Sequence, residues 1–239
     1  MILSELDATG QFTDDFLSVP AWLNDVNSGS SPPALSVASA GGGWLQLAPK
    51  AVANDYRTIA TGNVFELIKG SPVSATIRMR ITEAAALSSS FYLALTDTTA
   101  AGFLTTSGVP PASYNGCCLF KTAGSAALQF QTARGSVKNT LANVGTFVSG
   151  TALVLSLQFE PGLTASGGNV PAGTSRASAG SVISRVNGQS VGPTGTPLIA
   201  LPLGLVAMPP LCFAVGVLAS TSAAETLMLD YLIVEFSRA

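Results

Sequence analysis

The stretch Val73–Thr82 reads VSATIRMRIT and shows the most regular alternation in the chain. Apolar side chains occupy every second position, and serine, threonine and arginine fill the positions between them. Because successive side chains of a strand point to opposite faces of a sheet, this alternation predicts an antiparallel strand with one face on a core. Arg78 and Arg80 would lie on the other face, in water or paired with acids on a neighbouring strand or on another chain.

Short strands separated by clusters of glycine, proline, serine and asparagine are expected along the rest of the chain. Residues 90–96 (SFYLALT) would pair with the first strand, and Asn187-Gly188 is typical of a hairpin turn. Further strands are expected at residues 44–47, 63–68, 116–121, 127–133, 151–160, 181–186, 212–220 and 226–236. No helix is needed between them, so the sequence predicts an all-β protein.

Charge is scarce in this sequence. Charged residues make up 10% of the chain, against about 25% in an average soluble domain, and the formal net charge is −2. A chain of 239 residues with 47% hydrophobic content is long and apolar enough to bury a core. It carries no basic field to release counterions from a phosphate backbone, so nucleic acid is excluded as an expected partner.

The sequence contains no histidine, which removes imidazole bases, Ser-His-Asp triads and histidine-ligated metals. Cys117, Cys118 and Cys212 are expected to be small apolar core residues, as in a protein made in a reducing cytoplasm. Asp14-Asp15 with Asp25 or Asp97 is a weak calcium pattern, and a solvated turn is the favoured interpretation. We expect no metal and no cofactor.

Acidic residues near the C-terminus are the candidates for a glycosidase pair. Asp230 and Glu235 are five positions apart, as are Glu225 and Asp230. On a regular strand such pairs point to opposite faces. We therefore expect that the chain is not an enzyme.

One uncharged stretch, residues 198–218, is long enough to cross a bilayer by residue count. Pro202, Pro209 and Pro210 argue against a spanning helix, because lipid offers no replacement for the backbone hydrogen bonds that they remove. We expect no membrane span, and instead a proline-rich connection followed by a strand at 212–220 that is covered on both faces.

The chain is expected to hold one main domain. Residues 1–43 form an N-terminal segment with a flexible stretch rich in serine, glycine and proline, and residues 44–239 form the β-sandwich. Within the first segment, residues 12–16 (FTDDF) are expected to pair into the sandwich. Residues 162–180 carry one charge and are expected to form a long exposed loop or arm.

Three stretches together resemble the concanavalin A-like jelly roll of laminarinases and lectins. Residues 12–16 resemble its short opening segment, residues 73–81 and 91–96 its paired strands, and residues 228–234 (MLDYLIV) its closing strand beside the opening segment. The resemblance implies an antiparallel jelly-roll β-sandwich with an extended N-terminal segment and long loops. The ExDxxE-type catalytic strand of the glycosidase members is missing, so the resemblance carries the fold without an active site.

In its composition, which is low in charge and free of histidine, the sequence also resembles jelly-roll proteins that decorate tailed-bacteriophage capsids. Large, weakly polar surfaces are a solubility hazard on a free monomer and are better buried against other subunits. We therefore expect a virion structural protein on the outer capsid surface that binds the major capsid protein and forms a homotrimer or dimer. Its expected interface residues are Leu203, Leu205, Met208, Pro209, Pro210 and Phe213.

The alternative function is a glycan-binding or receptor-binding module of a phage tail fibre or surface protein. An aromatic ring beside a polar groove would stack on the sugar in that case. The aromatic residues expected to do so are Trp22, Trp44 and Tyr114.

Overall fold

The computed structural model shows a two-layer β-sandwich in which the strands of each layer are antiparallel. It describes residues 11–21, 23–28, 34–38, 43–63, 65, 73–98, 102–160, 181–191, 198–200, 209–222 and 225–236. These residues contain strands, turns and bends and no helix, so none of them forms a helix long and apolar enough to span a membrane. The predicted all-β jelly-roll class is confirmed.

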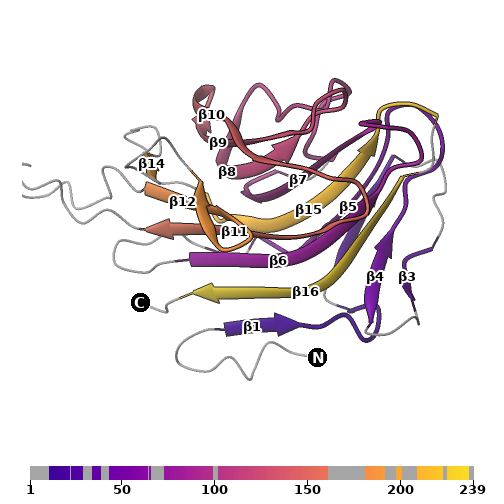
Figure 1. Ribbon diagram of the computed structural model, residues 1–239. Helices are drawn as coiled ribbons and strands as arrows, with labels where there is room; N and C mark the ends of the chain where they lie inside the picture. Colours follow the sequence, from indigo (N-terminus) through magenta and orange to yellow (C-terminus); the bar gives the residue numbers. More distant parts are fainter. Residues whose placement is uncertain are drawn as a thin grey trace, which may run out of the picture.

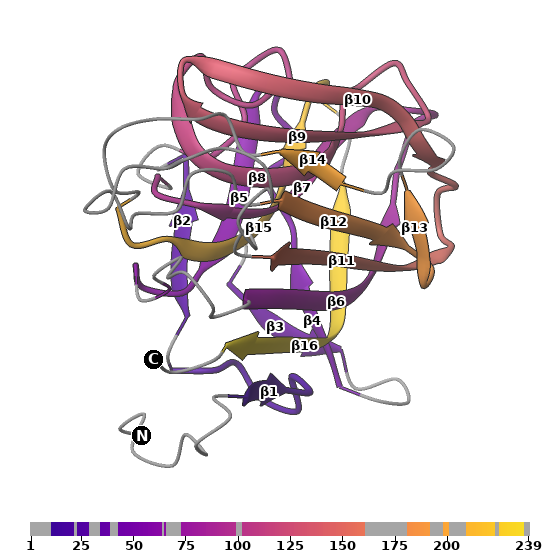
Figure 2. The same ribbon diagram turned by 90° about the vertical axis from the view of Figure 1, so that its left-hand side faces the viewer.

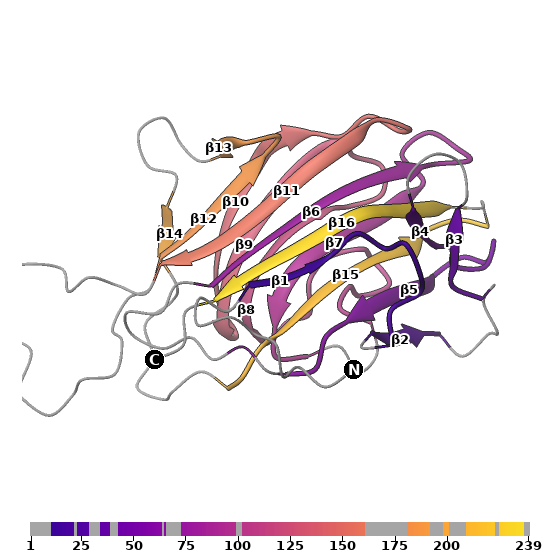
Figure 3. The same cartoon turned by 90° about the horizontal axis from the view of Figure 1, so that it is seen from below.

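One layer, sheet A, has strand β6 near its centre, paired with β11 on one side and β16 on the other. Figure 2 shows β12, β11, β6, β16 and β1 in succession, and Figure 3 shows the same strands side by side. In order, sheet A contains β13 (Gln189–Val191), β12 (Ser181–Val186), β11 (Ala152–Glu160), β6 (Val73–Thr82), β16 (Thr226–Phe236), β4 (Trp44–Leu47) and β3 (Ser36–Ala38). Two further strands join it, β1 (Gln11–Asp14) on β16 and β14 (Leu198–Ala200) on β12.

The other layer, sheet B, lies above sheet A in Figure 1. In order, it contains β10 (Val137–Thr146), β9 (Ala127–Gly135), β8 (Tyr114–Lys121), β7 (Ser89–Thr96), β15 (Cys212–Ala219), β5 (Asp55–Ala60) and β2 (Asn24–Asn27). Every residue of β7 and of β15 is buried, so both faces of these strands are covered, as expected for residues 212–220.

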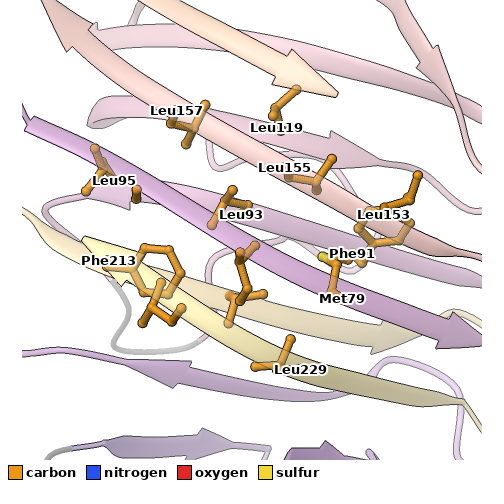
Figure 4. Close-up of a cluster of buried hydrophobic side chains, with 14 of the residues drawn as sticks. Met79, Phe91, Leu93, Leu95, Leu119, Leu153, Leu155, Leu157, Phe213 and Leu229 are labelled. Carbon is orange, nitrogen blue, oxygen red and sulfur yellow. The ribbon is translucent and has the colours of Figure 1, made fainter. Parts of the chain in front are cut away.

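The main core lies between the inner faces of the two sheets. From sheet A it receives alternate side chains such as Ile77 and Met79 of β6, and from sheet B side chains such as Phe91 of β7, all fully buried. Figure 4 shows Met79 of β6 beside Phe91 of β7 in this core. The alternation of Val73–Thr82 therefore does what the sequence predicted, with its buried positions on the core and its arginines on the outer face.

Before residue 44, the described residues contribute strands to both sheets. Strand β1 pairs with β16, with Gln11 opposite Glu235 and Asp14 opposite Leu232, so the opening segment lies beside the closing strand as the resemblance implied. Phe16 follows β1 and is fully buried in the main core. Strands β2 and β3 join sheets B and A, whereas much of the serine- and glycine-rich stretch after residue 28 lies outside the described residues.

Two strand predictions need correction. The expected strand at 63–68 is wrong for its described residues, because Asn63 lies in a bend and Phe65 forms an isolated bridge with Leu211. The neighbouring strand is instead β5, whose sequence DYRTIA lacks a regular alternation. Strand β10 was also missed, because its edge position leaves it mostly exposed and without an apolar face. The expected loop at 162–180 lies outside the described residues.

Gly116 of β8 lies against the backbone of β7. Its φ angle is +128°, and a β-carbon placed there would lie 1.9 Å from the carbonyl oxygen of Leu95. Gly150 also has a positive φ, +76°, but a β-carbon there would meet nothing within 4 Å. A substitution at Gly150 therefore introduces backbone strain alone, whereas one at Gly116 introduces both strain and steric overlap.

We expect Gly150→Ala to cost about 1–2 kcal/mol, the usual penalty for a non-glycine residue in the left-handed region. Gly116→Ala should cost at least twice as much, because β7 and β8 must also move apart. Urea unfolding at equilibrium measures both. Equal losses in the two variants would contradict this packing.

Candidate functional site

The outer face of sheet B is closed by its own loop. Residues 102–113 cover it, and the ring of Phe103 lies 4.9 Å from that of Tyr92 and 5.0 Å from that of Tyr114, centroid to centroid. These rings form a second apolar cluster together with Ala94, Cys118, Phe120, Ala214 and Leu218. The face is thus occupied by the chain itself.

Tyr114 was a candidate for stacking on a sugar, and the structure removes it from that set. The residue is 2% exposed, and its hydroxyl donates to Oε1 of Gln131 at 3.1 Å. Burial raises the pKa of the Tyr114 phenol far above its ordinary value, so the group stays protonated. The strand pattern alone could not reveal the loop that covers this ring.

The cysteines are confirmed as buried core residues, and all three are free thiols. Cys117 faces the main core, whereas Cys118 and Cys212 belong to the second cluster. Burial raises the pKa of the Cys117 and Cys212 thiols to about 12. Thiols in this state are poor nucleophiles.

The outer face of sheet A has a different character, because its central strand β6 presents polar, mostly half-buried side chains there. Hydrogen bonds join neighbouring strands across it. Thr76 of β6 donates to Ser156 of β11 at 2.9 Å, and Arg185 of β12 donates to Oε1 of Gln158 at 2.7 Å. The face therefore presents ordered donors and acceptors on regular strands.

A β-bulge in β16 changes which residues reach this face. The pairing with β6 shifts between Leu229 and Tyr231, so that Asp230 is an extra residue. Leu229 and Leu232 both point into the core, and Asp230 and Tyr231 both lie on the outer side. Bulges recur beside functional sites, where they redirect side chains.

The bulge overturns the prediction that Asp230 and Glu235 point to opposite faces. With one residue added to the alternation, both carboxylates lie on the outer face of sheet A. Strand rise places them about 15 Å apart, beyond the roughly 9.5 Å that a glycosidase pair spans. They are therefore not a matched catalytic pair.

At the bulge, five residues form what we call the Trp44 cluster: Trp44, Arg78, Arg80, Met228 and Asp230. The guanidinium carbons of Arg78 and Arg80 lie 5.4 and 5.0 Å from the centroid of the Trp44 ring, close enough for cation–π contacts. Arg78 also forms an ion pair with Asp230. The cluster thus combines an aromatic ring, two cations and one carboxylate.

Arg80 is the less satisfied of the two arginines. Its Nη2 donates to the sulfur of Met228 at 3.1 Å, and its Nε is buried without a hydrogen-bond partner. A thioether is a weak acceptor. Of the three sugar-stacking candidates, Trp44 is the one that the structure brings together with polar groups, while Trp22 lies outside the described residues.

The predicted subunit interface is only partly visible. Pro209 and Pro210 are exposed, whereas Leu203, Leu205 and Met208 lie outside the described residues. Phe213 is fully buried in the main core, so it cannot contribute to a surface between chains. The prediction for Phe213 is wrong because this residue occupies one of the alternate positions of β15 that point into the core.

The acidic residues considered for calcium have other partners. Asp25 forms an ion pair with Arg57 at 2.7 Å, Asp97 accepts from the backbone of Asn115 at 2.9 Å, and Asp14 accepts from the backbone of Phe16 at 2.7 Å. Among the described residues, no group of three or more carboxylates and thiols could hold a metal ion.

Sequence reasoning missed a buried cluster of charges at one end of the strands. The ammonium group of Lys121, fully buried, lies 3.0 Å from Oε1 of Glu83 and donates to the carbonyl of Ser89 at 2.7 Å. Glu225 is 1% exposed, forms a hydrogen bond with Ser88, and leaves its Oε2 buried without a partner.

The pKa values of the two carboxyl groups of this cluster are shifted in opposite directions. Burial alone would raise the pKa of Glu83, but hydrogen bonds from Ser89 and Lys121 outweigh burial and hold it below its ordinary 4.5. Burial raises the pKa of Glu225 above that value, against its hydrogen bond with Ser88, and the Glu83 charge raises it further. Glu83 is therefore the ionised partner of Lys121.

No protein-family model matches this chain, and no curated protein matches its sequence. Solved structures do match its fold. The carbohydrate recognition domain of Emp46p in its potassium-bound form has a TM-score of 0.60 at 7% identity, covering 92% of this chain and 94% of that one. Lectin UEA-II complexed with galactose has a TM-score of 0.57 at 8% identity, covering 95% and 98%.

An enzyme shares the fold as well. The endo-1,3-beta-glucanase from Streptomyces sioyaensis has a TM-score of 0.60 at 13% identity, covering 95% of this chain and 96% of that one. The fold is thus a concanavalin A-like jelly-roll β-sandwich, as found in lectins and glucanases. At these identities the likeness shows the fold alone.

The glucanase corrects the expectation that the chain is not an enzyme. That expectation took the fold to come without catalysis once the ExDxxE pattern was missing, and the comparison shows that nearly the whole chain superimposes on an enzyme. The exclusion of catalysis is therefore wrong. At 13% identity the comparison assigns no reaction and no catalytic residues to this chain.

The Glu225 carboxyl gives a test of the buried cluster. Because the folded state favours its protonated form, stability should fall as the pH rises above about 4.5 through the raised pKa. Glu83 has the opposite effect, since its contribution to stability is lost as the pH falls below 4.5 through its lowered pKa. Glu225→Gln removes the pH dependence of stability that Glu225 causes and leaves the one that Glu83 causes.

We expect the urea midpoint of the wild type to decrease relative to that of Glu225→Gln as the pH rises from about 4.5 to 7. The exposed Glu235→Gln variant is the matched control and should follow the wild type. Parallel pH profiles for the wild type and Glu225→Gln would show that Glu225 is ionised at no cost in the folded protein.

Proposed function

We propose that this protein is a glycan-binding β-sandwich whose binding surface is the Trp44 cluster on the outer face of sheet A. The observation that carries the proposal is an aromatic ring beside the Arg78–Asp230 ion pair on a polar, half-buried sheet face. The outer face of sheet B is filled by Phe103, Tyr92 and Tyr114, so it offers no such surface.

The chemistry of the cluster suits a sugar. A sugar ring has apolar C–H faces that pack on an aromatic ring and hydroxyl groups that need both donors and acceptors. Trp44 supplies the apolar surface, Arg78 supplies donors and Asp230 supplies acceptors. The groups differ in kind and lie within one cluster, as an orienting site requires.

The site is held rigidly before a ligand arrives. Its residues project from three neighbouring strands, in which β16 pairs with β4 on one side and with β6 on the other. The ion pair and the cation–π contacts fix the side chains further. Preorganisation of this kind lowers the entropy lost on binding. The lectin domains that share the fold support the proposal.

The hypothesis that this chain is a capsid decoration protein has no support from the comparisons and stays a prediction. Binding to the major capsid protein, self-association as a trimer or dimer, and a place on the outer capsid surface are untested. Of the residues assigned to that interface, Pro209 and Pro210 are the two that the structure shows exposed.

A glycan array probed with the purified protein, followed by calorimetry on the best ligand, tests the proposed function. Trp44→Ala should weaken binding about tenfold or more, because it removes the stacking surface and frees both arginines. Tyr114→Phe, a change to a buried ring on the other sheet, should bind as the wild type does.

Two results would contradict the proposal in different ways. If the wild type binds no glycan on the array, the function is wrong. If it binds a glycan with equal affinity after Trp44→Ala, the function stands and the site lies elsewhere.

A further inference from the structure

We propose that the glycan is an acidic polysaccharide, and that Arg80 and Arg185 bind successive carboxylate or sulfate groups along it. This inference rests on the proposed function and specifies its ligand. It is carried by two arginines on the outer face of sheet A that form no ion pair with any described residue, in a chain whose formal net charge is −2.

Arg80 has a charge that its neighbours do not balance. Within the Trp44 cluster, two arginines face one carboxylate, and that carboxylate is the ion-pair partner of Arg78. No carboxylate among the described residues lies within ion-pair distance of Arg80. The Trp44 ring attracts the cation but accepts no regular hydrogen bond from its N–H groups.

The hydrogen-bonding state of Arg80 points to an oxyanion. A guanidinium has five N–H donors in a planar fork that matches a carboxylate or sulfate. The contacts of Arg80 are a thioether and an aromatic face, and its Nε is buried without a partner. Because Nε is enclosed by the protein, a ligand oxyanion would meet the Nη groups, whose hydrogen bond to a thioether is weak.

Arg185 places a second cation on the same face. It lies opposite Ser156 of β11, which in turn lies opposite Thr76 of β6, so the three side chains share one row across the sheet. Its hydrogen bond goes to the neutral amide oxygen of Gln158. Two strand spacings and four residues of strand rise separate Arg185 from Arg80 by about 17 Å.

That separation favours a chain over a single sugar. One monosaccharide cannot reach both guanidinium groups, whereas a polymer with an acid group on each repeat can place separate groups on Arg80 and Arg185. The hydroxyl groups of Thr76 and Ser156 lie in the row of Arg185 and offer hydrogen bonds to the sugars between the two acid groups. The ligand class is thus a linear polysaccharide with repeated acid groups.

The test compares three polymers: polygalacturonate, which carries carboxylates, dextran sulfate, which carries sulfates, and neutral dextran. Affinity is measured by biolayer interferometry on the full chain at two salt concentrations. We expect at least one acidic polymer to bind at least tenfold more tightly than dextran, with the preference decreasing at high salt because screening weakens charge pairing. The better acidic polymer identifies the acid group.

Arg80→Gln and Arg185→Gln should each reduce the ratio of acidic to neutral affinity at least fivefold, and the double variant should abolish it. Arg80→Lys keeps the charge without the planar fork and should fall between the wild type and Arg80→Gln. Arg134→Gln, which removes an equal charge from sheet B, is the matched control and should keep the wild-type ratio. Urea midpoints of all variants establish that they are folded.

The outcomes separate this inference from the function on which it rests. Trp44-dependent binding of neutral glycans with no acidic preference overturns the inference and leaves the function standing. Loss of the preference in Arg134→Gln as well, or equal binding of single-stranded DNA, would mean non-specific attraction and also overturns it. An absence of any glycan binding contradicts both.

Discussion

The alternation of strand β6 is the constraint on which the rest of the structure depends. Between β11 and β16, its apolar positions complete the main core, and its polar positions form the middle of the outer face of sheet A. A shift of β6 by one residue would move both of its arginines into the core. The same ten residues therefore specify both the packing of the sandwich and the chemistry of its open face.

The two outer faces differ because the chain treats them differently. Loop 102–113 places Phe103 between Tyr92 and Tyr114, and sheet B becomes a second apolar layer. On sheet A, the bulge at Asp230 turns a carboxylate outward beside Arg78 and Trp44. The outer face of sheet B thus contributes to the packing of the protein, and the outer face of sheet A presents arginine side chains that we propose contact a ligand.

The strands with clear alternation could be predicted from the sequence, and β4, β6, β12 and β16 have their expected bounds. The Asp230 bulge could not, because no glycine or proline marks it. The buried charges had a signal that was overlooked: Glu83, Lys121 and Glu225 each have the core-facing parity of the strand beside them. The burial of Tyr114 depends on a loop, and loop positions are not specified by strand periodicity.

The central claim is that ligands meet the outer face of sheet A. The most direct measurement is a backbone amide NMR titration of the labelled protein with an acidic oligosaccharide. The account predicts shift changes concentrated in β4, β6 and β16 around Trp44, Arg80 and Asp230 and extending to Arg185 of β12, with residues 102–113 unchanged. Changes concentrated at Phe103 and Tyr114 instead would place the ligand on sheet B and contradict the account.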